Sequence, residues 1–297
     1  MRILVTGREG QLVRSLVEHA AGRADLELIT AGRPEIDLER PGSIAEAIDA
    51  ARPDLVVNAA AYTAVDQAEQ EREQAFRINA DAAGEAAAAA RDVGARFVQI
   101  STDYVFDGSG DRAWRPDDPT GPLGVYGASK LAGEQQVRAA HPEALILRTA
   151  WVYSPFGKNF VKTMLRLAEQ RDEVRVVGDQ RGCPTNGLDI ADAVLRVAEI
   201  WAEGRDAGVG STMHVGGSEA CSWAEFAEGV FAASAACGGP SARVVPITTA
   251  EFPTPARRPA NSVLDSSAFE QAFGWPIPSW RDSLAPVVER ILGGAEG

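Results

Sequence analysis

Residues 2–12 of the chain read RILVTGREGQL, and this stretch decides the fold. Arg2–Thr6 is a short run rich in β-branched residues, which is typical of a buried parallel strand. Gly7–Gly10 reads as a tight turn, and Gln11–Ala21 has the periodicity of a helix. A strand, a glycine turn and a helix in this order predict the first βα unit of a dinucleotide-binding sheet.

Strand and helix patterns continue to alternate over the first 150 residues. Further strands are expected at Leu26–Thr30, Leu55–Ala59, Phe97–Ser101 and Ala144–Thr149. Helices are expected at Ile44–Ala51, at Ala68–Val93 with a break near Gly84, and at Tyr126–Ala140. The alternation predicts right-handed βαβ units and hence an α/β fold with a Rossmann-type doubly wound parallel sheet.

The pattern becomes irregular after Trp151. Short strands are expected at Val174–Val177, Met213–Val215 and Arg243–Ile247, and helices at Asp189–Glu203, Trp223–Ala236 and Trp280–Leu292. We therefore expect a dinucleotide-binding domain over residues 1–150, re-entered at about 174–216. Residues 151–173 and 217–297 then form a smaller, mixed C-terminal lobe for the substrate, with the ligand site in the cleft between the two parts.

Composition narrows the partners and the compartment. The chain has 297 residues with 42 acidic and 29 basic side chains, so its net charge of −13 repels polyanions. We expect neither nucleic acid nor an anionic membrane as a partner. Cys183, Cys221 and Cys237 are an odd number without close spacing, which indicates reduced thiols. With no leader or long apolar run in the sequence, we expect a cytoplasmic protein.

The glycine loop and the end of the second strand indicate whether a dinucleotide binds and which one is preferred. The loop has the spacing G-x-x-G, and Val13 stands where the common fingerprint has its third glycine, so an ordinary βα turn is the alternative. No acid stands at Thr30–Arg33 to bind a ribose 2′-hydroxyl. Arg33 and Arg8 are candidates to neutralise a 2′-phosphate, unless both are solvated surface residues. NADPH is therefore preferred over NADH.

A tyrosine and a lysine four residues apart suggest carbonyl reduction. Tyr126 and Lys130 lie on one face of an expected helix, at its start. The lysine and the helix N-terminus are expected to lower the pKa of the phenol, so that Tyr126 becomes a usable general acid. Thr102 follows the fourth strand, where its hydroxyl can bond the substrate carbonyl and the phenol. A tyrosine and a lysine at this spacing often occur by chance. The presence of Thr102 at the end of the fourth strand strengthens the interpretation as a carbonyl-reducing site.

Together these residues resemble the extended short-chain dehydrogenase/reductase superfamily and, within it, the family of dTDP-4-dehydrorhamnose reductases. The resemblance covers nearly the whole chain. Its most specific motifs are VNAAAYTAVDQAE (57–69), STDYVFDG (101–108) and RPANSVLD (258–265). It implies reduction of the C4 keto group of dTDP-4-dehydro-β-L-rhamnose to dTDP-L-rhamnose by hydride transfer from NAD(P)H, with tyrosine as the proton donor.

The resemblance also implies a role for individual residues. The catalytic residues would be Thr102, Tyr126 and Lys130, of which the last two also touch the cofactor. Other cofactor contacts would be Gly7, Glu9, Gly10, Gln11 and Leu12 at the pyrophosphate, Asp37 and Leu38 at the adenine, and Ala59, Ala60 and Ala61 beneath the cofactor. The sugar would be surrounded by Val65, Thr102, Asp103, Tyr104, Tyr126 and Trp151. Candidates for the nucleotide diphosphate are Lys158, Asn159, Lys162, Arg257 and Arg258, with ordinary surface charge as the alternative.

The chain departs from the family pattern at one place. Some relatives carry a carboxylate just after the glycine loop that helps bind Mg²⁺ at a dimer interface. Arg14 and Ser15 stand there in this chain, and Leu188 stands where a second acid is expected. These residues argue against a metal and leave both a monomer and a homodimer open.

Two other functions are compatible with the same fold. One is reduction or epimerisation of another nucleotide sugar. The other is a non-catalytic regulatory subunit that binds NADP. The presence of Thr102, Tyr126 and Lys130 together favours an enzyme over the regulatory subunit.

Overall fold

Six parallel strands form the central sheet of the computed structural model, which describes residues 1–294. Their order is β10-β5-β4-β3-β1-β2, which confirms the doubly wound parallel sheet predicted from the sequence. The strands are β1 (Arg2–Thr6), β2 (Glu27–Ala31), β3 (Leu55–Asn58), β4 (Arg96–Thr102), β5 (Leu145–Thr149) and β10 (Thr212–His214). The connections reverse direction between β1 and β3, so the ligand crevice is expected at the carboxyl ends of these strands.

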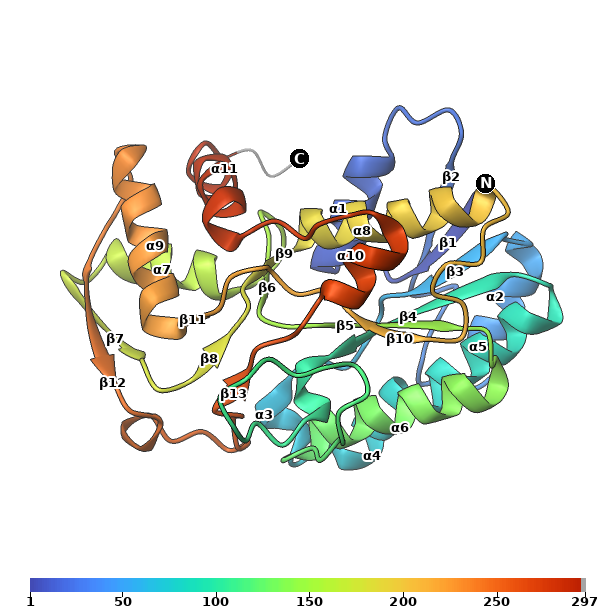
Figure 1. Cartoon of the computed structure of the whole chain (residues 1–297), viewed down its shortest axis with the longest axis horizontal. Helices are drawn as coiled ribbons and strands as arrows, with labels where there is room; N and C mark the ends of the chain where they lie inside the picture. Colours follow the sequence, from blue (N-terminus) through green and yellow to red (C-terminus); the bar gives the residue numbers. More distant parts are fainter. Residues whose placement is uncertain (295–297) are drawn as a thin grey trace.

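Helices cover both faces of the sheet (Figure 1). Alternate residues of β1 point to opposite faces, so Ile3 and Val5 join one core while Leu4 joins the other. The first core contains α1 (Gln11–Ala20) and α8 (Gly187–Ala202). The second contains α2 (Ser43–Ala51), α5 (Ala82–Asp92) and α6 (Val125–Ala140).

The long helix expected at Ala68–Val93 is wrong as a single element. It is divided into α3 (Val65–Ala68), α4 (Arg72–Phe76), a π-helical turn (Arg77–Asp81) and α5. Gly84 lies inside α5 and does not break it. The π turn carries Asn79, whose side chain accepts from the Tyr62 amide at 2.8 Å and donates to Ser129 Oγ at 2.9 Å. These bonds to neighbouring segments hold the inserted turn in place.

The C-terminal lobe has its own core. Strands β7 (Glu173–Val177) and β12 (Arg243–Ile247) pair in parallel and pack beside α7 (Phe160–Ala168), α9 (Trp223–Ala236) and α11 (Trp280–Leu292). Short elements complete the lobe and its junction with the sheet. They are β6 (Val152–Tyr153), β8 (Arg181–Gly182), β9 (Thr185–Asn186), β11 (Cys221–Ser222), β13 (Asn261–Ser262) and α10 (Ser267–Phe273).

The division of the chain into two domains stays a prediction. The strand pairing corrects the expected residue at which the chain returns to the sheet domain. β7 pairs with β12 rather than with a strand of the central sheet, so the chain returns to the sheet through α8 and β10, later than residue 174. The part of the chain after Trp151 contains two helices that were not expected from the sequence, α7 and α10. Residues 295–297 of the predicted lobe lie outside the described part of the chain.

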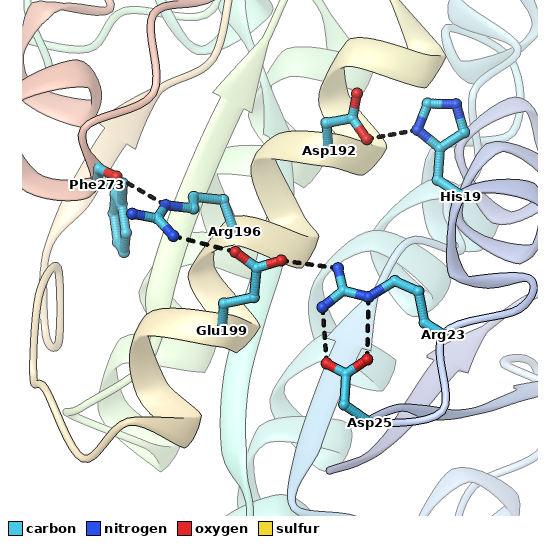
Figure 2. A network of polar contacts seen from close by, with 7 residues as sticks. All are labelled: His19, Arg23, Asp25, Asp192, Arg196, Glu199 and Phe273. Atoms are coloured by element: carbon cyan, nitrogen blue, oxygen red, sulfur yellow. Dashed lines mark hydrogen bonds and ion pairs between the residues drawn. The ribbon is translucent and has the colours of Figure 1, made fainter.

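Polar contacts on the outer side of the sheet join α1, α8 and α10 (Figure 2). Figure 2 shows His19 of α1 facing Asp192 of α8, with Nδ1 and Oδ1 2.5 Å apart. Arg23 reaches both Asp25 and Glu199, and Arg196 connects Glu199 to the carbonyl of Phe273 at the end of α10. Within residues 1–294, no helix is both long and apolar enough to cross a bilayer.

Candidate active site

Thr102 and Tyr126 lie together at the carboxyl end of β4, and the Lys130 side chain contacts the same strand at Ile100. Thr102 is the last residue of β4, Tyr126 is the second residue of α6, and Lys130 follows one turn later. The ammonium of Lys130 donates to the carbonyl oxygen of Ile100 at 2.7 Å. This bond ties the first turns of α6 to β4 and keeps the lysine beside the strand that carries Thr102.

Burial dominates the ionisation of Tyr126. It raises the pKa of the phenol to about 12, and although hydrogen bonding with Thr102 lowers this pKa, the negative charge of Asp103 raises it. The expected lowering of this pKa by Lys130 and the helix N-terminus is therefore wrong for the protein alone. At neutral pH the phenol keeps its proton, which is the state that a proton donor needs.

Lys130 is shifted in the opposite direction. Its side chain is buried, with only 5% of the residue exposed, and burial lowers the pKa of the ammonium to about 8. The Glu134 carboxylate, one turn further along α6, opposes this shift. Glu134 is itself paired with Arg148 of β5 at 2.7 Å and accepts from Ser101 Oγ at 2.5 Å. Lys130 is thus a cation at pH 7 that is close to losing its proton.

Asp103 and Tyr104 complete the polar group at the strand end. Asp103 is buried, its carboxylate accepts from Thr102 Oγ1 at 3.0 Å, and burial raises its pKa to about 6. The Tyr104 ring meets the Tyr126 ring edge to face, with centroids 5.4 Å apart. The backbone of Tyr104 also lies close to α6 at Gly127, where a Cβ would overlap the carbonyl oxygen of Tyr104.

The glycine loop leads directly into the N-terminus of α1. Gly7 has a φ of 104°, which favours glycine, and its amide donates to the Ala31 carbonyl at 2.7 Å. Gly10 caps α1, and no side chain in residues 1–294 bonds to the amides of the first turn as a cap. Those amides and the helix dipole suit a pyrophosphate. Val13 is buried against Gly7, so a side chain packs where other loops have a third glycine.

Gln11 and Asn159, assigned to different ligands from the sequence, bond to each other. Gln11 Oε1 accepts from Asn159 Nδ2 at 3.1 Å and from Ser154 Oγ at 2.8 Å. Asn159 also caps α7, since its Oδ1 accepts from the Lys162 amide at 3.2 Å. Asn159 therefore joins the glycine loop to the C-terminal lobe, and this structural role explains it without a phosphate.

Thr6 is a site residue that the sequence analysis missed. Its hydroxyl donates to Asn58 Oδ1 at 2.7 Å and accepts from the amides of Ala59 and Ala60, each at 3.0 Å. These three hydrogen bonds fix the start of the segment Ala59–Ala61, which was predicted to pass beneath the cofactor. The available signal was Thr6 itself, a polar residue at the end of an otherwise apolar strand. A polar side chain that is buried at such a position is expected to have hydrogen-bond partners.

The arginines predicted at a 2′-phosphate are exposed and already paired. Arg33 forms ion pairs with Asp37 at 3.2 Å and with Glu39, and Arg8 pairs with Glu35 at 2.5 Å. Asp37, which was predicted to contact the adenine, is therefore one of the carboxylates that pair with these arginines. The preference for NADPH stays a prediction, and a 2′-phosphate would have to compete with these carboxylates.

A cavity of about 760 Å³ lies between the strand ends and the C-terminal lobe. Tyr104 and Trp151 line it from the sheet side, and Trp223 lines it from the lobe. The indoles of Trp151 and Trp223 are stacked, with centroids 3.5 Å apart. Of the diphosphate candidates, Arg258 lines this cavity, whereas Lys158 and Arg257 are exposed on the surface. A largely apolar cavity with a few polar groups suits a nucleotide sugar.

The residues after the glycine loop do not fit a divalent metal. The guanidinium of Arg14 lies over the Phe156 ring at 4.3 Å, and Ser15 Oγ donates to the Gln11 carbonyl at 2.8 Å. Across residues 1–294, no three His, Cys, Asp or Glu side chains gather as a metal site.

The chain is similar in sequence and in structure to known proteins. Residues 1–292 match the family model described as RmlD substrate binding domain. A dTDP-4-dehydrorhamnose reductase of Sinorhizobium fredii is 46% identical over 292 residues, covering 98% of each chain. The structure of a dTDP-4-dehydrorhamnose reductase from Clostridium acetobutylicum superimposes with a TM-score of 0.90 and 38% identity, covering 98% of this chain and 100% of the other. That of a Bacillus anthracis dTDP-4-dehydrorhamnose reductase in complex with NADP has a TM-score of 0.87 and 36% identity, covering 96% and 98%.

Proposed function

The chain belongs to the RmlD substrate binding domain family, and from this membership we propose that it reduces the C4 keto group of dTDP-4-dehydro-β-L-rhamnose to dTDP-L-rhamnose. The chain is an oxidoreductase, and relatives that are 40–46% identical to it are named dTDP-4-dehydrorhamnose reductase. We place the reaction in the cytoplasm, as a step in the biosynthesis of dTDP-rhamnose.

One observation carries the proposal. A buried threonine and a protonated phenol lie together at one strand end, a buried ammonium contacts the same strand, and Tyr104, which packs on the phenol ring, lines a cavity of about 760 Å³. Carbonyl reduction needs a donor for the developing alkoxide, and Tyr126 and Thr102 supply one. A regulatory subunit would not need this arrangement, so the site favours an enzyme.

Each residue has a distinct part in the proposed reaction. Thr102 holds the substrate carbonyl against Tyr126, and Tyr126 gives its proton to the oxygen at C4 as the hydride arrives at the carbon. Lys130 stabilises the phenolate that remains and orients the nicotinamide ribose. Asp103, Tyr104, Trp151 and Val65 surround the sugar. Proton donation of this kind contributes about 10²–10⁴ in rate.

The proposed cofactor is NADPH, which supplies the hydride when bound. The uncapped amides at Gly10–Leu12 receive the pyrophosphate, and Ala59–Ala61 form a floor of small residues. The NADP complex of the relative from Bacillus anthracis supports this assignment. NADH is the weaker candidate, because no carboxylate stands directly at the end of β2.

An absorbance assay of nicotinamide oxidation tests the proposal. The protein is mixed with NADPH, and separately with NADH, in the presence of dTDP-4-dehydrorhamnose generated in the cuvette. We expect stoichiometric oxidation of NADPH and formation of dTDP-rhamnose. An epimerase would leave NADPH unconsumed, and a regulatory subunit would bind NADPH without turnover. Absence of oxidation with both cofactors would refute the reductase.

A further inference from the structure

The backbone of Trp151 is held in an unfavourable conformation at the cavity wall. Its φ is 49°, in the left-handed region that favours glycine, and a bulky side chain there costs free energy. The residue follows β5 closely, and Thr149, two positions earlier, is the register partner of Thr102. Such a conformation persists only where the surrounding structure holds it, so neighbouring residues must fix the Trp151 side chain.

The indole of Trp223 is one of these neighbours. Its ring stacks on the ring of Trp151 with an interplanar angle of 8°. Trp223 is the first residue of α9, and a capping box between Ser222 and Glu225 fixes this helix end. The ring of Phe160 in α7 also contacts Trp223, with centroids 4.6 Å apart. Trp223 therefore presents a firmly held surface to Trp151.

Gly182 supplies the second contact. It lies in β8, where the extended backbone suits every residue type, so its missing side chain matters here for space. A Cβ at this position would lie 2.3 Å from Trp151 Cε2 and 2.7 Å from Trp151 Nε1. One edge of the indole therefore lies directly against the Gly182 backbone, and a larger residue would displace the ring.

One small sheet carries both contacts. Its middle strand β8 pairs with β11 and β13, and Gly182 is the register partner of Cys221, two residues before Trp223. The two supports thus belong to a single unit of the C-terminal lobe, whereas Trp151 continues from a strand of the central sheet. The lobe thereby sets the orientation of a side chain that was predicted to surround the sugar.

The stacked pair is not ordinary core packing. Trp151 and Trp223 are half-buried, and both line the cavity beside Tyr104, whose ring contacts the proposed proton donor. By contrast, Trp280 in the core of the same lobe is buried. Part of the stacked surface is therefore accessible to a ligand, and apolar walls of this kind orient a ligand in a cavity.

We propose that Trp223 and Gly182 are positioning residues for the reduction, because together they hold the Trp151 indole in the orientation that places the sugar ring against Tyr126. The inference rests on the proposed function, since it concerns the orientation of that substrate. Both residues act through the Trp151 ring. Loss of either support lets this ring leave its orientation, so that the bound sugar is presented less often to the proton donor.

Fluorine NMR of the full chain labelled with fluorotryptophan measures the ring contact without any substrate. The chain has six tryptophans, and Trp151→Phe identifies the Trp151 resonance by removing it. Because a stacked ring shifts its neighbour upfield, Trp223→Leu should move this resonance downfield, and Trp223→Phe should retain part of the shift. Trp275→Phe removes a half-buried indole that packs on the core of the sheet domain, so it should leave the Trp151 resonance unchanged.

Steady-state kinetics with NADPH and dTDP-4-dehydrorhamnose measures the effect on the reaction. We expect Trp223→Leu to lower kcat about 10- to 100-fold, as misplacement of a reacting group does, and Trp223→Phe to restore most of the rate. The affinity for NADPH, measured by fluorescence titration, should stay unchanged, because the cofactor is assigned to the glycine loop and not to this wall. Trp275→Phe should change neither quantity.

A double-mutant cycle tests whether the effects pass through Trp151. Gly182→Ala should lower kcat about 10-fold in the wild-type background, since its methyl group displaces the indole. Beside Trp151→Phe the effect should be smaller, because the phenyl ring is shorter and leaves room for the methyl group. The effect of Trp223→Leu should shrink in the same background.

The outcomes separate this inference from the proposed function. A wild type that turns over dTDP-4-dehydrorhamnose, with Trp223→Leu and Gly182→Ala equally active, would overturn the positioning role and keep the reductase. A loss of kcat that is undiminished beside Trp151→Phe, or is matched by a loss of NADPH affinity, would also overturn it. An unmoved Trp151 resonance in Trp223→Leu would show that the ring contact is absent. A wild type without turnover would refute the reductase, and the positioning role with it.

Discussion

The ammonium nitrogen of Lys130 lies 2.7 Å from the carbonyl oxygen of Ile100, two residues before Thr102 on the same strand. One hydrogen bond thus connects the helix that carries Tyr126 to the strand that carries Thr102. The same bond leaves Lys130 in a buried environment, where its charge is sensitive to pH.

The rate is expected to fall in alkaline solution because of Lys130. Its pKa of about 8 means that the ammonium loses its proton as pH rises through 8, and with it the charge that we propose stabilises the phenolate during turnover. Tyr126, with a pKa raised to about 12, stays protonated over this range and adds no second decline. A pH profile of kcat measures this, and Lys130→Arg should lower kcat but remove the decline near pH 8. A wild-type rate that stays constant to about pH 10 would contradict the assignment.

Tyr126→Phe is expected to reduce kcat by about 10²–10⁴, because the variant lacks the proton donor and keeps the ring. Steady-state kinetics with NADPH measures the loss, and fluorescence titration should show that NADPH binding persists. Tyr62→Phe is the matched control, since it removes a phenol that bonds Glu71 at 2.6 Å outside the reacting group. Similar losses of kcat in both variants would mean that Tyr126 is not the donor.

Glu134→Ala is expected to destabilise the protein by about 3–5 kcal/mol, since it leaves the Arg148 guanidinium buried and unpaired. Urea denaturation measures the free energy of unfolding. Arg243→Ala breaks an exposed ion pair with Glu173 and should cost less than about 1 kcal/mol. Equal effects of the two substitutions would show that the buried pair is no more important to folding than a surface pair.

The pair of His19 and Asp192 is expected to make stability depend on pH. The hydrogen bond that His19 donates to the Asp192 carboxylate raises the pKa of His19 above its usual value near 6.5, so the folded state binds a proton more tightly than the unfolded state. The stabilisation is therefore complete below about pH 6.5 and is lost as pH rises through the raised pKa. Tm measurements should show a larger loss for Asp192→Asn at about pH 5.5 than at about pH 8.

Asp206→Asn provides the control for this pH dependence. Asp206 pairs with Arg96 at 2.5 Å, and an arginine keeps its charge at both pH values. The change in Tm from Asp206→Asn should therefore be similar at the two pH values. If Asp192→Asn behaved in the same way, His19 would not be the titrating group.

Much of the fold follows from patterns within short stretches of chain. The strands and helices of the first 150 residues lie close to the expected ranges, because burial on one or both faces leaves a period that can be read locally. The glycine turn before α1 was similarly visible, since a φ of 104° at Gly7 favours one residue type. The long helix was misread because the bonds of Asn79 to Tyr62 and Ser129, which hold the π turn, are not local.

The sequence by itself determined the parallel sheet and the family, since these depend on periodicity and on motifs a few residues long. Only the tertiary structure decided that Arg258, rather than Arg257, lines the cavity and that Asp66 holds it. It also decided the sign of the pKa shift at Tyr126. The physical reason is the same in both cases: desolvation and long-range pairing depend on which distant segments surround a side chain, and neighbours in sequence do not specify them.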